Sequence, residues 1–298
     1  MTHGAGHDKP AWRPVKSRAR SLLLPVAVSA LLSAGCGGAP SRPAPPPISL
    51  DADGPGGEET YALIRKAFGY SSLECPDLSP NNHSGFLHIQ EDADAEAGPH
   101  FVFYMHRDLD KDRDTCPGEC DRQRNEIKGY DTSPEAMKGR EGETMVVRWM
   151  MKVGDGMAVS HSWTHFFQLK AVGGDDSQPL VTLSAARRGN DDYLEVRHCS
   201  SSVYEVLART PWAPVRGRWL RVECRATFRE EGSLHLSVAA LDGTPVLKVE
   251  GNRLRMWRGN DFVRPKWGIY RGLADKDELR PDEETVRFAA FRISKERP

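Results

Sequence analysis

Hydrophobic and polar positions alternate along most of the chain after residue 100. In Trp219–Phe228 every second residue is apolar, and the residues between them are Arg, Glu or Thr. A period of two is the side-chain period of a β-strand with one face in a core. Thr144–Val153 is apolar on both faces, as expected of a central strand with a layer on each side. The pattern predicts a protein built mainly of strands.

Further strand candidates follow one another at short intervals: Phe101–His106, Ser162–Val172, Leu180–Ala185, Tyr193–His198, Leu234–Leu241, Val246–Val249, Lys266–Arg271 and Val286–Ile293. Gly, Asn and Asp residues of the kind that form turns separate them. Only Tyr61–Phe68 has a helical pattern, and it is short. Many short strands at this spacing predict an all-β sandwich or jelly roll.

The N-terminus has the pattern of an export signal. Residues 1–20 carry five basic residues and one acid, and residues 21–35 are apolar or small. Such a segment is typical of a secretory signal and is too short to span a membrane as a mature helix. Its ending, Leu32–Gly35 before Cys36, resembles the lipobox of bacterial lipoproteins, with the usual Leu one place early.

The lipobox resemblance implies that residues 1–35 are removed and that Cys36 carries a lipid anchor in the bacterial cell envelope. Gly37 in place of Asp gives no signal for inner-membrane retention, which favours the outer membrane. There are two alternatives to a lipoprotein: an ordinary secreted protein whose signal is cleaved nearby, or a segment that serves only as an anchor helix.

The next segment, 36–57, contains six Pro and five Gly, which predicts a tether that cannot pack a core. The folded domain is therefore expected at 58–298, a length that suits one large β domain. We expect the protein to be a monomer.

The charge balance changes when the leader is removed. The full 298 residues have 41 Lys+Arg and 42 Asp+Glu, and loss of five bases and one acid leaves 36 against 41. With 39% hydrophobic residues the chain can bury a core, so whole-chain disorder is excluded. An acidic mature chain also argues against a nucleic-acid partner.

Six cysteines are present, of which Cys36 is the expected site of lipidation. An exported protein meets an oxidising compartment, so pairing of the others is expected. The sequence favours a cross-strand Cys199–Cys224 pair and one bond among Cys75, Cys116 and Cys120. No metal site is expected from the cysteines, because no second close Cys/His pair lies at ligand spacing.

Three strand segments carry polar residues at a spacing of two, which places those residues on one face. In the first, Arg124 and Glu126 share a face and could pair. In the second, Gln168 and Lys170 share one face of the strand. His165 is expected on the other face, in the core with its apolar neighbours. Taken one at a time, each segment is also typical of an ordinary solvated strand face.

In the third segment, Lys266, Gly268 and Tyr270 point outward, while Trp267 and Ile269 point inward. A glycine between two long polar side chains suggests an open place where a ligand approaches the backbone. If the three outward faces line one concave sheet, the groove contains Arg, Lys, Gln and Tyr. That set suits an anionic sugar, because Arg binds a carboxylate bidentately.

Together and in this order, the three segments resemble the polysaccharide lyases with a concanavalin-A-like jelly roll. The matching motifs are R-x-E-I at 124–127, Q-x-K at 168–170 and K-x-G-x-Y at 266–270. The resemblance is to the heparin lyase I and glucuronan lyase group, more distantly to the alginate lyases, and covers roughly 58–294. It implies a concave groove and β-elimination at a uronic acid of an anionic polysaccharide.

The resemblance also implies roles for individual residues. Arg124 and Gln168 match the positions that engage the carboxyl group, with Glu126 beside them. Tyr270 matches the tyrosine used as an acid, and in some members also as the base, and Lys266 matches the lysine of that strand. No cofactor is implied as required.

Lys170 departs from the pattern, because the heparin and alginate lyase motifs often carry His there. A lysine acts as a base only if its pKa falls well below about 10.4. Tyr270 serving both steps is one alternative, and a non-catalytic module that binds anionic glycan is another. A glycoside hydrolase needs two carboxylates in the groove, and only Glu126 is a candidate.

A run of acidic residues, Asp108–Asp114 with Glu119, has the spacing of an EF-hand loop. Arg113 stands where that loop needs Gly, and no helical pattern flanks the run, which argues against an EF-hand. A calcium site of another kind, or a solvated acidic loop, are the two interpretations left open.

Overall fold

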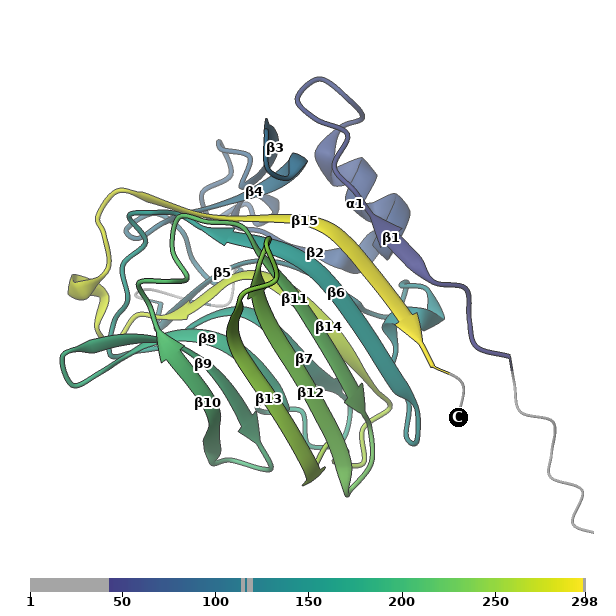
Figure 1. The fold of residues 1–298 in the computed structure, drawn as a ribbon. Helices are drawn as coiled ribbons and strands as arrows, with labels where there is room; N and C mark the ends of the chain where they lie inside the picture. Colours follow the sequence, from purple (N-terminus) through teal and green to yellow (C-terminus); the bar gives the residue numbers. More distant parts are fainter. Residues whose placement is uncertain (1–42, 114–115, 117–119, 297–298) are drawn as a thin grey trace, which may run out of the picture. The chain divides into compact units, whose positions relative to one another are not determined.

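The structure is a computed structural model that describes residues 43–113, 116 and 120–296. Its strands form two antiparallel sheets (Figure 1). The outer sheet has the order β13 (Pro245–Leu254), β12 (Gly232–Ala240), β11 (Leu220–Thr227), β6 (Thr144–Val153), β15 (Glu283–Lys295), β4 (Gly98–His106) and β3 (Ile89–Asp94), with β1 (Ile48–Leu50) paired to β15.

The second sheet, called here the groove sheet, has the order β10 (Tyr204–Pro211), β9 (Asp191–Cys199), β8 (Val181–Arg188), β7 (Thr164–Val172), β14 (Phe262–Gly272), β5 (Arg122–Lys128) and β2 (Leu73–Glu74). β14 lies between β5 and β7, and β15 lies between β4 and β6, so late strands are inserted between early ones. The predicted all-β jelly-roll sandwich is confirmed.

Large apolar side chains from the two sheets form the core between them. Trp149 of β6 packs on Phe167 of β7 with ring centroids 4.5 Å apart, and Trp267 of β14 packs on Phe291 of β15 at 5.1 Å. All four side chains are buried. The inward positions of the predicted strands supply these residues, as the alternation indicated.

A helix, α1 (Thr60–Phe68), follows β1, and short 3₁₀ turns lie at Tyr70–Ser72, Pro76–Leu78, Glu135–Met137 and Lys276–Glu278. The side chain of Glu59 caps α1 by accepting hydrogen bonds from the backbone N–H groups of Tyr61 and Ala62. Residues 61, 64 and 68 form its buried face. The predicted helix is therefore present.

The expected tether, 36–57, reaches into the folded domain. Ile48–Leu50 forms β1 and pairs with β15, and Leu50 is buried. The predicted boundary near Glu58 is thus about ten residues too late, because the backbone of this Pro-rich segment completes an edge of the outer sheet. The leader and Cys36 lie outside the described residues. Within the described residues, no helix is long and apolar enough to cross a membrane.

Candidate active site

A cavity of about 520 Å³ lies on the face of the groove sheet that points away from the core. Side chains from β5, β7, β8, β9, β10 and β14 line it, so the six strands contribute to one surface. Its size is that of a ligand site. We call this cavity the groove.

The three sequence segments predicted to meet do meet, because β7, β14 and β5 are neighbours. Tyr270 of β14 lies opposite Arg124 of β5 on one side and opposite His165 of β7 on the other. Further along β14, beyond an irregularity, Lys266 lies opposite Gln168. Arg124, Gln168, Lys170 and Tyr270 all line the groove.

His165 also lines the groove, which corrects the expectation that it belongs to the core. The pairing register shifts on both sides of β7 between residues 165 and 167, where β7 has one residue more than β8 and one residue fewer than β14. Phe166 and Phe167 are both buried in the core, although they are consecutive residues. The residues before Phe166 therefore face the opposite side from the one that regular alternation predicts. His165 and Gln168 consequently face the same way, although three residues separate them.

Lys266 does not reach the groove. Its ammonium group is fully buried and ion-paired to Glu74 at 2.7 Å and to Glu126 at 2.6 Å. It therefore cannot touch a substrate as a catalytic residue. It neutralises carboxylates below the floor of the groove.

Glu126 is likewise beneath the floor, with 1% of its surface exposed. It accepts from Arg124 at 2.8 Å, as the shared face predicted, and from the amide of Gln168 at 2.5 Å. Glu74 of β2 accepts from Arg124 and Lys128, and its pKa is held well below its usual range, because Lys266, Arg124 and Lys128 outweigh its burial. These groups form one buried ion network.

Arg124 is tied into this network on three sides. Its Nε and Nη2 donate to Asp112 at 2.7 and 3.2 Å, and its Nη1 donates to the two glutamates. Its guanidinium also lies 3.8 Å from the centre of the Tyr270 ring, a cation–π contact. Arg124 thus holds the ring of Tyr270, and most of its N–H donors are already directed at carboxylates.

The hydroxyl of Tyr270 accepts a hydrogen bond from Arg122 at 3.3 Å. Burial raises the pKa of Tyr270, while Arg124 and the bond from Arg122 act in the opposite direction. The phenol therefore keeps its proton at neutral pH. Arg124 and Arg122 would stabilise the phenolate that forms when the proton is transferred.

Lys170 is partly buried and lies near several positive charges. Burial, together with the nearby cations Lys266, Arg264 and Arg258, lowers its pKa to about 8, against the attraction of Asp176. Its amine is therefore partly neutral near physiological pH. This is the shift that a lysine base at this position requires.

His165 is also uncharged at neutral pH, because burial, with Arg197 and Arg124 nearby, holds its pKa well below its usual range. Its Nδ1 lies 2.7 Å from the hydroxyl of Ser184, and its ring stacks on Trp163 with centroids 4.4 Å apart. It presents a neutral imidazole beside Tyr270.

Gly268 is not the open place that the sequence suggested. Its φ is 147°, and a Cβ there would clash with the backbone oxygen of Asn125 on β5. The glycine is needed because two backbones pass close to each other at the irregularity in β14.

Arg197 and Arg122 are groove residues that the motifs did not single out. Nε of Arg197 donates to Glu195, and its buried Nη2 has no hydrogen-bond partner among the described residues. The described lining residues include four cations, Arg122, Arg124, Lys170 and Arg197, against one carboxylate, Asp121. The alternation around Arg197 resembled any strand, so only the structure reveals it as a groove residue.

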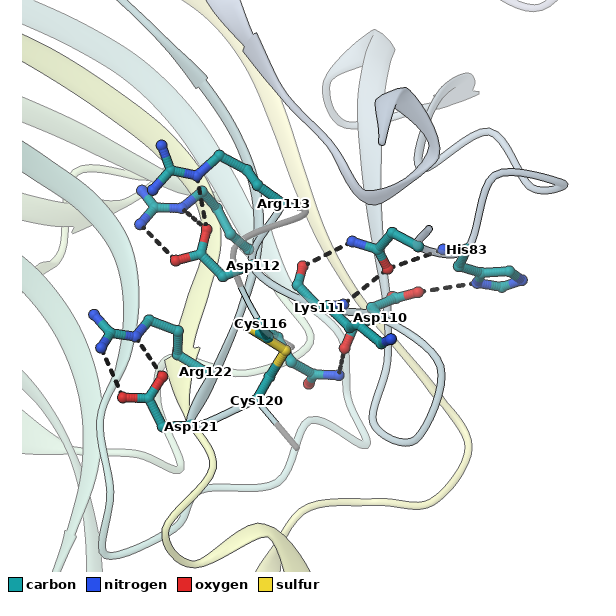
Figure 2. The surroundings of a disulfide bond; sticks show 12 residues. His83, Asp110, Lys111, Asp112, Arg113, Cys116, Cys120, Asp121 and Arg122 are labelled. Carbon is teal, nitrogen blue, oxygen red and sulfur yellow. Dashed lines mark hydrogen bonds and ion pairs between the residues drawn. A yellow bond between two sulfur atoms is a disulfide. The ribbon is translucent and has the colours of Figure 1, made fainter. Parts of the chain in front are cut away.

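The cysteines pair in one of the two predicted ways. Cys116 and Cys120 form a disulfide in the connection between β4 and β5 (Figure 2). Cys199 and Cys224 are free and buried, because β9 and β11 belong to different sheets, and Cys75 is free as well. The expected Cys199–Cys224 bond is wrong.

The acidic run lies in the same connection. Asp110 is held by three histidines, and Asp112 by Arg124 and Arg113. Asp114 and Glu119 lie outside the described residues. Two of the carboxylates expected to bind calcium therefore already contact cationic or imidazole groups, and calcium binding stays a prediction.

Comparison with known proteins identifies the fold. No protein-family model matches the chain, and no curated protein matches its sequence. The alginate lyase Aly36B is similar in structure, with a TM-score of 0.55 at 10% identity over 85% of this chain and 98% of that one. An alginate lyase from Aplysia kurodai has a TM-score of 0.55 at 14% identity over 84% and 98%.

An endo-β-1,4-glucuronan lyase from the fungus Trichoderma reesei is similar at a TM-score of 0.47 and 15% identity, over 69% of this chain and 86% of that one. At these identities the likeness concerns the fold alone. The two alginate lyases, with TM-scores of 0.55, support the jelly-roll sandwich.

Proposed function

We propose that this chain is a polysaccharide lyase that cleaves a uronic-acid-containing glycan by β-elimination. The observation that carries the proposal is the meeting of a protonated tyrosine, Tyr270, and a lysine of lowered pKa, Lys170, in one cationic groove. A proton donor and a proton acceptor beside an anion-binding surface are the groups that this reaction needs.

In the proposed reaction, Lys170 removes the proton at C5 of the uronate, a C4–C5 double bond forms, and the bond from C4 to the glycosidic oxygen breaks. Tyr270 gives its proton to the leaving oxygen. The C5 proton becomes acidic only when the carboxylate is neutralised, and hydrogen-bond donors that stabilise developing charge supply this effect.

Arg122, Arg197 and Gln168 are proposed to engage the uronate carboxylate. Arg122 is partly exposed at the groove, and Arg197 has an Nη2 without a partner among the described residues. Gln168 lines the groove and has a second amide hydrogen besides the one that it donates to Glu126. Arg124 and Lys266 are positioning residues in this proposal, because carboxylates of the protein hold them. His165 supports Tyr270 from the side opposite Arg124.

The groove gives little support to a glycoside hydrolase. That reaction uses two carboxyl groups flanking the scissile bond. Among the described lining residues, Asp121 is the one carboxylate, and it is paired with Arg122, while Glu126 lies beneath the floor.

The test is incubation of the full mature chain with alginate, glucuronan and heparin-like polymers. Elimination produces a 4,5-unsaturated uronate, so ultraviolet absorbance should rise while mass spectrometry finds fragments without added water. If folded protein yields neither signal from any uronate polymer, the lyase proposal fails.

A non-catalytic module that binds anionic glycan is the second candidate, favoured by the four lining cations. Binding of a uronate polymer with no shortening of the chain during long incubation would select it.

Lipid anchoring at Cys36, with residence in the bacterial cell envelope, is part of the proposal and rests on the leader sequence. Metabolic labelling with a fatty-acid analogue should label the wild type and leave a Cys36→Ala variant unlabelled.

A further inference from the structure

A second cluster of polar side chains lies outside the groove. Nδ1 of His83 and Nε2 of His88 each lie 2.9 Å from Oδ1 of Asp110, and Nδ1 of His106 lies 3.3 Å from Oδ2. One ligand atom of each of the four residues lies within 4.8 Å of the others. The cluster joins the segment before β3, the end of β4 and the loop that follows (His83 and Asp110 in Figure 2).

Two outer carboxylates lie at the imidazole nitrogens that point away from Asp110. Nδ1 of His88 lies 2.9 Å from Asp77, and Nε2 of His106 lies 3.3 Å from Glu283. A neutral imidazole has one N–H, and when the outer carboxylate accepts it, the inner nitrogen of the ring is left with a lone pair that can bind a metal.

The inner nitrogens of both rings then direct lone pairs at Asp110, whose carboxylate oxygens are acceptors as well. Lone pairs facing one another in a buried place repel unless a cation lies between them. A cation bound between them would therefore satisfy the inner nitrogens and the carboxylate together.

The donor set indicates which cation fits. Three imidazoles and one carboxylate are ligands of zinc and neighbouring transition metals, whereas calcium prefers oxygen ligands alone. A carboxylate behind a metal-binding histidine is the usual outer contact, and here two histidines have one. Zinc bonds of about 2.0–2.1 Å place tetrahedral ligand atoms about 3.3 Å apart, so small side-chain movements suffice.

Burial also suits an ion. The side chains of His88 and Asp110 are fully buried, while those of His83 and His106 are 24% and 16% exposed, which leaves one side open for entry. The ring of Phe86 packs against all three histidine rings, at 4.8–5.7 Å, and gives the site an apolar wall.

We propose that His83, His88, His106 and Asp110 bind one divalent transition-metal ion, with zinc as the best fit. The ion would tie the start of β3 to the end of β4 and to the loop before β5. Two residues beyond Asp110, Asp112 holds Arg124, and the amide of Gln123 donates to the carbonyl oxygen of Asp110 at 2.6 Å. The metal would thus brace the wall of the groove, whatever the groove binds.

The competing occupant is a proton. Although burial acts against it, the carboxylates of Asp110 and Asp77 raise the pKa of His88 to about 9, so a doubly protonated His88 could supply the charge. A cluster that holds only a proton would bind no metal.

The test uses the full mature chain, dialysed without chelator and analysed for metal by mass spectrometry, then titrated with Zn²⁺ or with Co²⁺ as a visible probe. One equivalent per chain is expected, with the intense absorption of tetrahedral Co²⁺. His83→Ala should weaken Zn²⁺ binding at least tenfold, and Glu283→Gln about 10–100-fold. His235→Ala, at an exposed histidine of β12, should change nothing.

X-ray absorption at the zinc edge gives a second reading that needs no variant. It should show nitrogen and oxygen neighbours with imidazole scattering and no sulfur, which separates this site from Cys75, Cys199 and Cys224. Folded wild type that binds neither ion, sulfur in the zinc shell, or wild-type affinity in a folded His83→Ala variant would each overturn the proposal. If His83→Ala does not fold, Glu283→Gln and the absorption spectrum decide.

Discussion

The outward faces of the two sheets carry similar polar residues in very different surroundings. On the outer sheet, Arg148 pairs with Glu223 at 2.6 Å with both side chains about half exposed, and Lys248 pairs with Glu250 in the same way. On the groove sheet, Glu126 pairs with Lys266 at the same distance, with both side chains almost completely buried.

Water solvates the ions of the outer sheet, so those pairs contribute little. The ions beneath the groove have only one another, so removal of one leaves another uncompensated. A buried layer of ion pairs, rather than a polar strand face as such, therefore distinguishes the candidate active site.

The largest expected effect comes from removing a buried carboxylate. Glu126→Ala should destabilise the protein by about 3–5 kcal/mol, because Arg124 and Lys266 lose a partner where water cannot replace it. Glu223→Ala on the outer sheet should cost less than about 1 kcal/mol. Urea unfolding of both variants measures this, and equal losses would contradict the contrast between the two faces.

A glycine pair gives the next largest difference. Gly268→Ala should destabilise by about 3 kcal/mol, since it adds a backbone clash to a strained φ. Gly243, in the turn between β12 and β13, has a φ of 90°, and a Cβ there would meet no atom within 4 Å, so Gly243→Ala should cost only about 1 kcal/mol. Thermal unfolding compares them, and a Gly268→Ala protein as stable as Gly243→Ala would refute the close approach.

The pH dependence of turnover should reveal the lowered pKa of Lys170. A base must be unprotonated, so kcat/KM should fall about tenfold per pH unit below pH 8 and level off above it. If His165 were the base, its low pKa would make the rate flat between pH 7 and 8.

Lys170→Arg should abolish that rising limb along with most of the activity, because arginine stays charged. The matched variant Lys248→Arg, at an exposed lysine of the outer sheet, should keep the wild-type profile. A profile that falls as pH rises through 8 would mean that Lys170 acts as a cation.

Alternation of hydrophobic and polar residues sufficed to predict the sandwich and most of its longer strands, because period two is a local property. It did not indicate β3 or β10. It failed where the strand is irregular. The register shift at Phe166 reverses the faces of β7, and no local signal distinguishes this residue from its neighbour Phe167. The proposed Cys199–Cys224 bond failed for a related reason, since local patterns do not say which sheet a strand joins.

The site could be predicted in part. Adjacency of Arg124, Gln168 and Tyr270 followed from the resemblance, but the burial of Lys266 depends on Glu74, a residue of a two-residue strand far away in sequence. The histidine cluster escaped notice because its members come from three segments, and only folding brings them to Asp110.

The most direct test of the central claim is a comparison of Tyr270→Phe with Tyr70→Phe, a control at an exposed tyrosine, on a uronate polymer that the wild type cleaves. The account predicts that Tyr270→Phe lowers the rate of unsaturated-uronate formation about 10²–10⁴-fold, with glycan affinity nearly unchanged by calorimetry, while Tyr70→Phe matches the wild type. Wild-type turnover by a folded Tyr270→Phe protein would contradict the account.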